Sequence, residues 1–354
     1  MKADSRPSPE SDARTFLAGN GSAATISRDD SGLRVMSGGG VLMSLAFSGA
    51  DRLKLESAPS DPQLALRAVS AAIEAVFGWH PGLGRLGIDV GGYGHLADEL
   101  CRHGLAVSTG NELAVLPELT MQLPHNWLAD PDRPPFPPFY EMTAGKRHPR
   151  RPPKPEGLAY ARFIPWLRQV VSFRAASLDS DLHLVHRWMN DPRVAAAWSE
   201  AGDLDKHRRY LSGLLADPHM LPMIGSFDGV PFGYFEIYWA KENRLAPFYD
   251  ADDYDRGWHV VVGEEVFRGR RFISAWLPSL MHYMFLDDCR TQRIVGEPAA
   301  SHRQQIRNLE VSGFAKIKNF DFPHKRATLV MLLRERFFGD RLWLPASSES
   351  IASA

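Results

Sequence analysis

Hydrophobic residues in the first third of the chain recur with two different periods. Short alternating segments separated by Gly, Asn and Asp predict strands, whereas apolar residues three and four apart over 61–77, behind a proline at a helix-start position, predict an amphipathic helix. A second helix is expected near 95–103. The predicted strands lie near 22–28, 33–36, 41–47, 52–56, 86–90 and 112–116. We therefore expect an α+β module over 15–129, behind a disordered tail at 1–14.

Proline dominates the next segment. Residues 130–156 contain too many prolines for a helix, so we expect an extended connector over 130–160. We expect this connector to pack along the body of the protein, with its basic residues forming a solvated face. A second domain is expected over 161–345, followed by a tail at 346–354.

The second domain alternates again between strand and helix patterns. The pair Asp228-Gly229 predicts a hairpin turn. Pro192 is expected to end the helix that is predicted near 182–190. Strands are predicted near 170–174, 223–227, 232–239, around His259, and near 293–297 and 327–333. Helices are predicted near 182–190, 205–216, 272–285 and 302–312. The fold class is α/β (α+β), and the similar order of elements suggests that the first module is a degenerate copy of the second domain.

Composition narrows the classes of function. The 354 residues are 44% hydrophobic and 23% charged, with a net charge of −1, as in an ordinary globular protein rather than a nucleic-acid binder. No stretch approaches the ~20 apolar residues of a membrane helix, and the polar N-terminus does not have the pattern of a signal peptide. Two cysteines cannot form a disulfide framework, which favours the reducing cytoplasm.

A basic glycine turn follows the strand that contains His259. Arg268, Gly269, Arg270 and Arg271 come directly before an amphipathic helix, so free N–H groups and the positive end of the helix dipole would face one point. This arrangement predicts an anion site of the kind that binds a pyrophosphate. Solvated arginines at a helix start are the ordinary alternative.

His259 and Glu297 are the candidate catalytic residues. Histidine has an unperturbed pKa near neutrality and can act as a general base. A carboxylate at the end of the next strand could orient the ring, although Glu297 could equally pair with a nearby arginine. His183 and His186 share a helical face, but neither has an acidic or cysteine partner at metal-site spacing, so no metal is expected.

Several short motifs resemble the GNAT N-acetyltransferases, and most closely the aerobactin-type branch that acylates hydroxylated lysine or ornithine. The resemblance extends over about 123–344. It rests on the segments HRWMNDPRV (186–194), GYFEIYW (233–239), DRGWH (255–259), RT (290–291), EP (297–298) and FPHKRA (322–327). In the phosphate-turn motif of the family only Gly269 is in place, since Val266 and Arg271 replace its first and last residues.

The resemblance implies an acyltransferase that uses acetyl-CoA, or another acyl-CoA, as co-substrate and needs no metal. His259 occupies the position of the family's catalytic histidine. The implied cofactor-binding residues are Val260, Val261, Val262, Arg268, Gly269, Arg270 and Arg271. The candidate acceptor-binding residues are Glu236, Tyr238, Trp239, Trp188, Asn190, Asp255 and Lys325.

The implied reaction acetylates the hydroxylated side-chain amine of lysine, giving a hydroxamate for siderophore assembly. The acceptor would be a small hydroxylated amino acid or polyamine, and other siderophore-assembly enzymes are candidate partners. Alternatives are hydroxyornithine as acceptor, a longer acyl group, an aminoglycoside N-acetyltransferase, or a coenzyme A-binding module without turnover. Sequence does not distinguish lysine from ornithine, and it does not give the oligomeric state or the role of the first module.

Overall fold

The computed structural model describes residues 14–17, 23–49, 51–109 and 112–345. The chain divides into two compact units, one made of 1–132 with 162–168 and the other of 133–161 with 169–354. This division puts most of the predicted connector with the second unit. Residues 1–13 of the expected N-terminal tail, and the whole expected C-terminal tail, lie outside the described residues.

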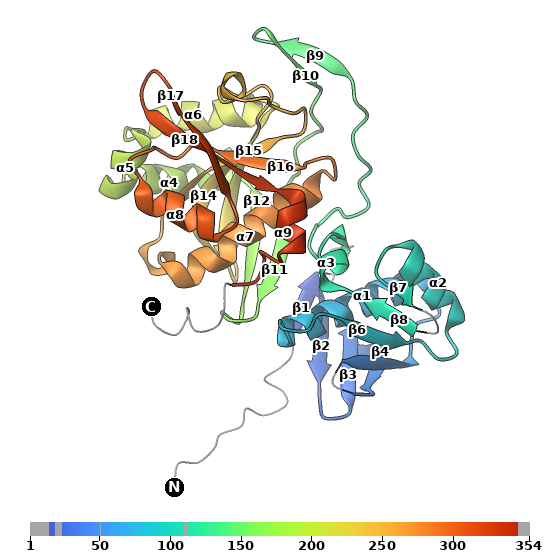
Figure 1. Cartoon of the computed structure of the whole chain (residues 1–354). Coiled ribbons are helices and arrows are strands. Elements are labelled where there is room, and N and C mark those ends of the chain that lie inside the picture. The colour runs from blue at the N-terminus through green and yellow to red at the C-terminus, as the bar shows by residue number, and fades with distance from the viewer. Residues whose placement is uncertain (1–13, 18–22, 50, 110–111, 346–354) are drawn as a thin grey trace. The chain divides into compact units, whose positions relative to one another are not determined.

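The second unit is built on one sheet with the strand order β11-β12-β13-β14-β15-β16-β18-β17 (Figure 1). Pairing is antiparallel from β12 to β15 and from β16 to β17, and parallel between β15 and β16. The strands are β11 Leu158–Ile164, β12 Gln169–Ala175, β13 Met220–Phe227, β14 Val230–Trp239, β15 Arg256–Val262, β16 Arg293–Gly296, β17 Ala315–Asp321 and β18 Arg326–Leu333.

Strands β15 and β16 pair over a very short length. The parallel register joins Arg256 to Ile294 and Gly257 to Val295, and the described residues show no further pairing between the two strands. The strands therefore separate beyond Gly257, and the backbone of 258–262 has an open edge at the point where His259 lies.

Helices connect these strands. Between β12 and β13 lie α4 Leu178–Met189, α5 Pro192–Trp198 and α6 Leu204–Ala216. Helix α7 Arg270–Asp287 joins β15 to β16, α8 Arg303–Val311 joins β16 to β17, and α9 Arg334–Gly339 follows β18. Short 3-10 helices occupy Ala246–Phe248 and Glu265–Phe267. Helix α4 ends before Pro192, as predicted, and a new helix begins at that proline. Asp191 caps α5 by accepting from the N–H groups of Arg193 and Val194, and proline is tolerated in the first turn.

Part of the connector pairs with itself and with the second unit. Strands β9 Tyr140–Thr143 and β10 Lys146–Pro149 form an antiparallel hairpin. Arg151 is buried and makes a bidentate ion pair with Glu242, while Lys146 donates to the backbone carbonyls of Glu242 and Asn243. These basic residues hold the connector in place rather than forming a solvated face.

The first unit has its own sheet, in the order β1-β2-β3-β4-β5-β6-β8-β7. Its strands are β1 Arg14–Leu17, β2 Ala23–Arg28, β3 Gly32–Ser37, β4 Gly40–Phe47, β5 Arg52–Ser57, β6 Leu86–Asp89, β7 Val107–Thr109 and β8 Glu112–Val115. Its helices are α1 Pro62–Trp79, α2 Gly94–Arg102 and α3 Pro117–Thr120, with a 3-10 helix at Pro124–Asn126. A continuous apolar core packs α1 against these strands.

The two sheets share one topology. In each, the fifth and sixth strands are the parallel pair, an 18-residue helix connects them, and the last two strands exchange places. The first unit is simpler, because its second and third strands form a direct hairpin where the second unit inserts three helices. The expected degenerate copy is therefore visible in the order of the strands.

Candidate active site

The site is centred on His259, which lies on β15 directly opposite Glu236 of β14. The ring nitrogen Nδ1 lies 3.1 Å from Glu236 Oε2, and Nε2 lies 3.1 Å from Glu297 Oε1. Glu297 directly follows β16, so three neighbouring strands supply the group. The side chains of both glutamates are almost fully buried, whereas that of His259 is 26% exposed. The ring is therefore held by two carboxylates and still accessible from one side.

This geometry decides the charge of the ring. An ionised carboxylate only accepts hydrogen bonds, so both ring nitrogens carry hydrogen and His259 is an imidazolium. Burial acts to lower the pKa of His259, but the hydrogen bonds and charges of Glu236 and Glu297 outweigh it and raise that pKa to about 9. In this state the ring has no lone pair to offer, so the general-base role predicted for it requires a proton to leave first.

Tyrosine hydroxyls surround the two carboxylates. Tyr210 and Tyr234 donate to Glu236, and Tyr238 donates to Glu297 Oε2 at 2.8 Å. Burial acts to raise the pKa of Glu297, but His259, Lys325 and the Tyr238 hydroxyl hold it at about 2. Glu297 is therefore ionised at neutral pH. Tyr234 could have been found from sequence, because it shares a strand face with Glu236 two residues later.

Trp198 also borders the site, where it packs against the adjoining apolar cluster. Its half-buried ring meets that of His259 edge-on at 6.1 Å between centroids. Its indole nitrogen donates to the carbonyl of Val260 at 3.3 Å. The indole therefore lies over the strand that carries His259.

The predicted acceptor residues fall into two groups. Glu236, Tyr238 and Lys325 lie at the site; the Lys325 ammonium donates to the carbonyl of Glu297 at 2.8 Å. The other four make polar and ring contacts elsewhere in the fold: Trp188, Asn190, Trp239 and Asp255.

Each residue of this second group has an identifiable structural contact. Trp188 donates to Glu264, and Asn190 joins the end of α4 to the backbone of Gly202. The guanidinium groups of Arg151 and Arg256 both lie over the ring of Trp239, and Asp255 makes a bidentate pair with Arg293. The structure does not bring these side chains to His259.

The basic glycine turn opens onto a large cavity. Gly269 precedes α7 with φ of +104°, a conformation that a side chain would strain. The cavity has a volume of about 950 Å³. Val262, Arg268, Gly269, Arg270 and Arg271 all line it. Arg268 is partly engaged with the carbonyl of Gly263 and with Asp191, which fastens the turn. Val260 and Val261 are not among the lining residues, and Val261 is buried against α4 and α6.

Two further walls of this cavity were not predicted from the sequence. Helix α8 contributes Gln304, Arg307, Asn308 and Val311, and Ser312 follows directly at its C-terminal end. The segment after α9 contributes residues 340–345 except Trp343, which is buried against Phe337 and Phe338 and so fixes the segment. Only the folded chain brings this segment beside the glycine turn, so local sequence patterns carry no signal for it.

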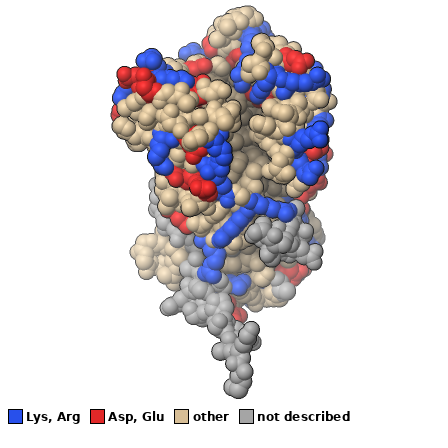
Figure 2. Space-filling view, turned by 90° about the vertical axis from the view of Figure 1, so that its left-hand side faces the viewer, with Lys and Arg blue, Asp and Glu red and all other residues tan. Residues whose placement is uncertain are grey.

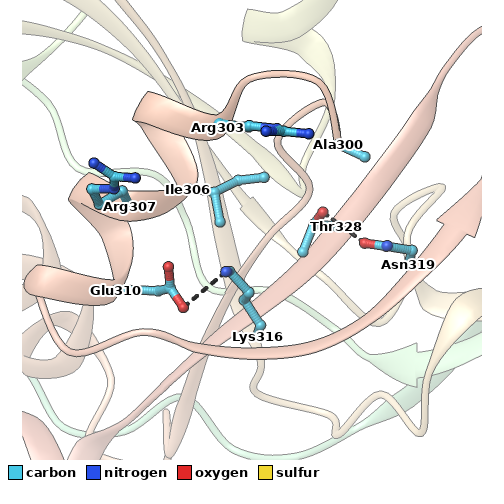
Figure 3. A pocket seen from close by; sticks show the side chains of 8 residues that line it. All are labelled: Ala300, Arg303, Ile306, Arg307, Glu310, Lys316, Asn319 and Thr328. Atoms are coloured by element: carbon cyan, nitrogen blue, oxygen red, sulfur yellow. Dashed lines mark hydrogen bonds and ion pairs between the residues drawn. The ribbon is translucent and has the colours of Figure 1, made fainter.

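A smaller recess of about 350 Å³ lies between α8 and strands β17 and β18 (Figure 3). Arg303 and Ile306 line it, and Lys316 forms an ion pair with Glu310 at its lower side. Neither His259 nor a glutamate of the site lines this recess. The same is true of the larger cavity, to which β15 contributes Val262.

Charge and membrane patterns of the described residues agree with the composition. On the face shown in Figure 2, basic side chains are interspersed with acidic ones. No helix in the described ranges has the length and apolar character needed to cross a bilayer. The same residues contain no cluster of three or more His, Cys, Asp or Glu that could hold a metal.

Comparison with known proteins indicates which family the second unit resembles. Residues 177–322 match the family described as "Acetyltransferase (GNAT) domain". A Bacillus halodurans protein of uncharacterised function, solved by crystallography, matches with a TM-score of 0.50 at 28% identity, over 53% of this chain and 96% of its own. Residues 177–322 are therefore similar to a GNAT acetyltransferase domain, as the motifs predicted.

Two curated relatives have related functions. The chain is 45% identical over 215 residues to the N(5)-hydroxyornithine:cis-anhydromevalonyl coenzyme A-N(5)-transacylase SIDF of Beauveria bassiana, covering 59% of this chain and 45% of the relative. It is 44% identical over 190 residues to the N(6)-hydroxylysine O-acetyltransferase of Escherichia coli, covering 54% of this chain and 60% of the relative. The chain thus spans about half the length of these relatives.

Proposed function

We propose that this protein is an acyl-CoA-dependent N-acyltransferase that acetylates the hydroxylated side-chain amine of lysine, giving a hydroxamate for siderophore assembly. One observation carries the proposal: a protonated His259 is held between two carboxylates, beside the opening between β15 and β16. The names of the two relatives support the choice of a hydroxylated amino acid as acceptor. The enzymes that hydroxylate the amine and couple the hydroxamate are its expected partners, in the cytoplasm.

Acyl-CoA would supply the activated acyl group as a thioester. The N–H groups at the start of α7 and the side chains of Arg270 and Arg271 suit its pyrophosphate, because a helix N-terminus and nearby cations favour an anion. Because Gly269 has a positive φ, which a residue with a side chain would adopt only with strain, that corner has no side chain. Backbone groups on the open edge of β15 can then polarise the thioester carbonyl.

The chemistry requires one proton to move from the acceptor nitrogen to the thiol sulfur. As the nitrogen attacks the carbonyl carbon, a C–N bond forms and the C–S bond breaks. His259 can release its Nε2 proton toward the sulfur, and the same ring nitrogen can then take up the proton that the acceptor nitrogen loses. Glu297 stays ionised and holds the ring through their 3.1 Å contact. The pair ends the cycle in its starting state.

A second candidate is transfer of a longer acyl group to hydroxyornithine. The printed name of the Beauveria relative, a cis-anhydromevalonyl transacylase, favours it. The same residues would perform the chemistry, and the size of the acyl and acceptor pockets would select the substrates.

Release of free thiol from acetyl-CoA tests the proposal, with N6-hydroxylysine, N5-hydroxyornithine and an aminoglycoside as acceptors. We expect the fastest release with N6-hydroxylysine and a product that forms a coloured ferric complex, since a hydroxamate does so and an O-acetyl hydroxylamine does not. His259→Ala should lower turnover by ~10²–10⁴-fold with little change in coenzyme A affinity. His183→Ala, an exposed histidine on α4, is the matched control. No release with any hydroxylamine acceptor would refute the function.

A further inference from the structure

Two cations that come from distant parts of the sequence meet beside the catalytic carboxylate. Arg244 follows β14, and its Nη2 lies 3.4 Å from Glu297 Oε1. Lys325 lies in the turn between β17 and β18, and its ammonium donates to the backbone carbonyl of Glu297. Phe322 lies beneath both, with the two charges 5.3 and 5.7 Å from its ring centroid. The cations are therefore neighbours on one aromatic platform.

These two charges are not neutralised by the contacts that they make. Burial lowers the pKa of Lys325, the charge of Glu297 opposes this shift, and the charge of Arg244 adds to it, so the two cations repel each other. Among the described residues, Glu297 is the only carboxylate within ion-pair distance of Arg244, and it already bonds to His259 and Tyr238. The Arg244 side chain remains 50% exposed, so its other donors can be reached by a ligand.

The charges of the whole site leave a positive excess. Glu236 and Glu297 are balanced by His259 and one of the two cations, so the remaining cation lacks a counter-charge. A planar guanidinium beside an ammonium suits a carboxylate, which can accept from both. The same excess repels a polycation such as a polyamine or an aminoglycoside.

We propose that Arg244 and Lys325 bind the α-carboxylate of the acceptor, so that the enzyme selects a free hydroxylated amino acid over the corresponding hydroxylated amine. The inference rests on the proposed function and adds a specificity determinant to it. The methylene stem of the acceptor would then lie along Phe322, with the hydroxylamine directed toward His259.

The test compares two acceptors that differ only in the carboxylate: N6-hydroxylysine and its decarboxylated counterpart, N-hydroxy-1,5-diaminopentane. We expect wild-type kcat/KM to favour the amino acid by about 10–100-fold, as a charged hydrogen-bonded contact would. Arg244→Gln and Lys325→Gln should each reduce this ratio about tenfold, mainly through KM for the amino acid. Each variant should lose less activity with the amine than with the amino acid, because the amine has no carboxylate for these cations to bind. Lys318→Gln, an exposed lysine on β17, should leave the ratio unchanged.

The outcomes separate this inference from the function on which it rests. If wild type releases thiol equally well with both acceptors, the enzyme is a hydroxylamine acyltransferase but the carboxylate site is wrong. An unchanged ratio in both Gln variants leads to the same conclusion. Coenzyme A affinity, measured by titration on each variant, shows whether it is folded, and the wild-type comparison stands even if a variant is not. No thiol release with either acceptor would instead reject the function.

Discussion

His259 shows how two neighbouring carboxylates can change the expected protonation state of a residue. An isolated histidine is mostly neutral at pH 7, which is why the sequence predicted a base. Glu236 and Glu297 occupy both ring nitrogens and keep the ring protonated. The sequence contains both glutamates, but only the pairing of β14 with β15, and the position of β16, reveals that they meet at one ring.

The charge of His259 predicts how stability depends on pH. Its folded pKa of about 9 lies above the value of about 6.5 in an unfolded chain, so its contribution is complete below about pH 6.5 and is lost as pH rises through 9. The loss should amount to at most about 3 kcal/mol. Urea unfolding of wild type and His259→Gln at pH 6 and pH 10 measures it. Wild type should lose more stability than the variant between these pH values, and equal losses would contradict the buried imidazolium.

Other residues of the site had weaker signals or none. Tyr238 and Lys325 were predicted because they lie in family motifs, and both lie against Glu297. Tyr210 comes from α6, which is distant in sequence from Glu236. Arg244 comes from an irregular loop, in which no periodicity indicates the direction of a side chain. Conversely, Trp239 and Asp255 lie in motifs, but they pair with arginines away from the ring. A motif residue can serve the fold as readily as the chemistry.

At the scale of elements, local sequence patterns predicted those helices and strands that local interactions determine. The helix expected over 61–77 is α1 Pro62–Trp79, and the expected strand near 52–56 is β5 Arg52–Ser57. Helix α5 was missed because Pro192 was read only as a stop, although Asp191 caps a new first turn. Strand β17 was missed because it is an exposed edge with little apolar alternation.

The turn before α7 makes an element-scale prediction. Gly269→Asp should weaken coenzyme A binding by at least about tenfold, since it adds a negative charge at the phosphate corner and strains a backbone with φ of +104°. Nothing lies within 4 Å of the added Cβ, so the loss would not arise from a clash. Gly104→Asp is the matched control, because it has a positive φ and open space but lies in the first unit. Equal affinity for wild type and Gly269→Asp, by calorimetric titration, would move the phosphate site elsewhere.

At the scale of the whole molecule, one topology occurs twice but only one copy has the parts of a catalytic site. The sheets match in strand order and in the placement of the parallel pair. The segment before α1 reads SAPSD, and the carboxylate of Asp61 caps the helix by accepting from the N–H of Gln63. An acid at the helix start occupies the donors that a phosphate would need and adds repulsion. The first unit therefore keeps the architecture without the anion corner.

This difference predicts a stoichiometry of one coenzyme A per chain. The second unit supplies the arginines and the open glycine corner, whereas the start of α1 presents a carboxylate. Calorimetric titration of the full chain should give a single class of site, and Gly269→Asp should weaken it without revealing a second. Asp61→Asn, which keeps the cap but removes the charge, should not alter the stoichiometry. Two sites per chain in wild type would mean that the first unit retains cofactor binding, contrary to the chemistry of its helix start.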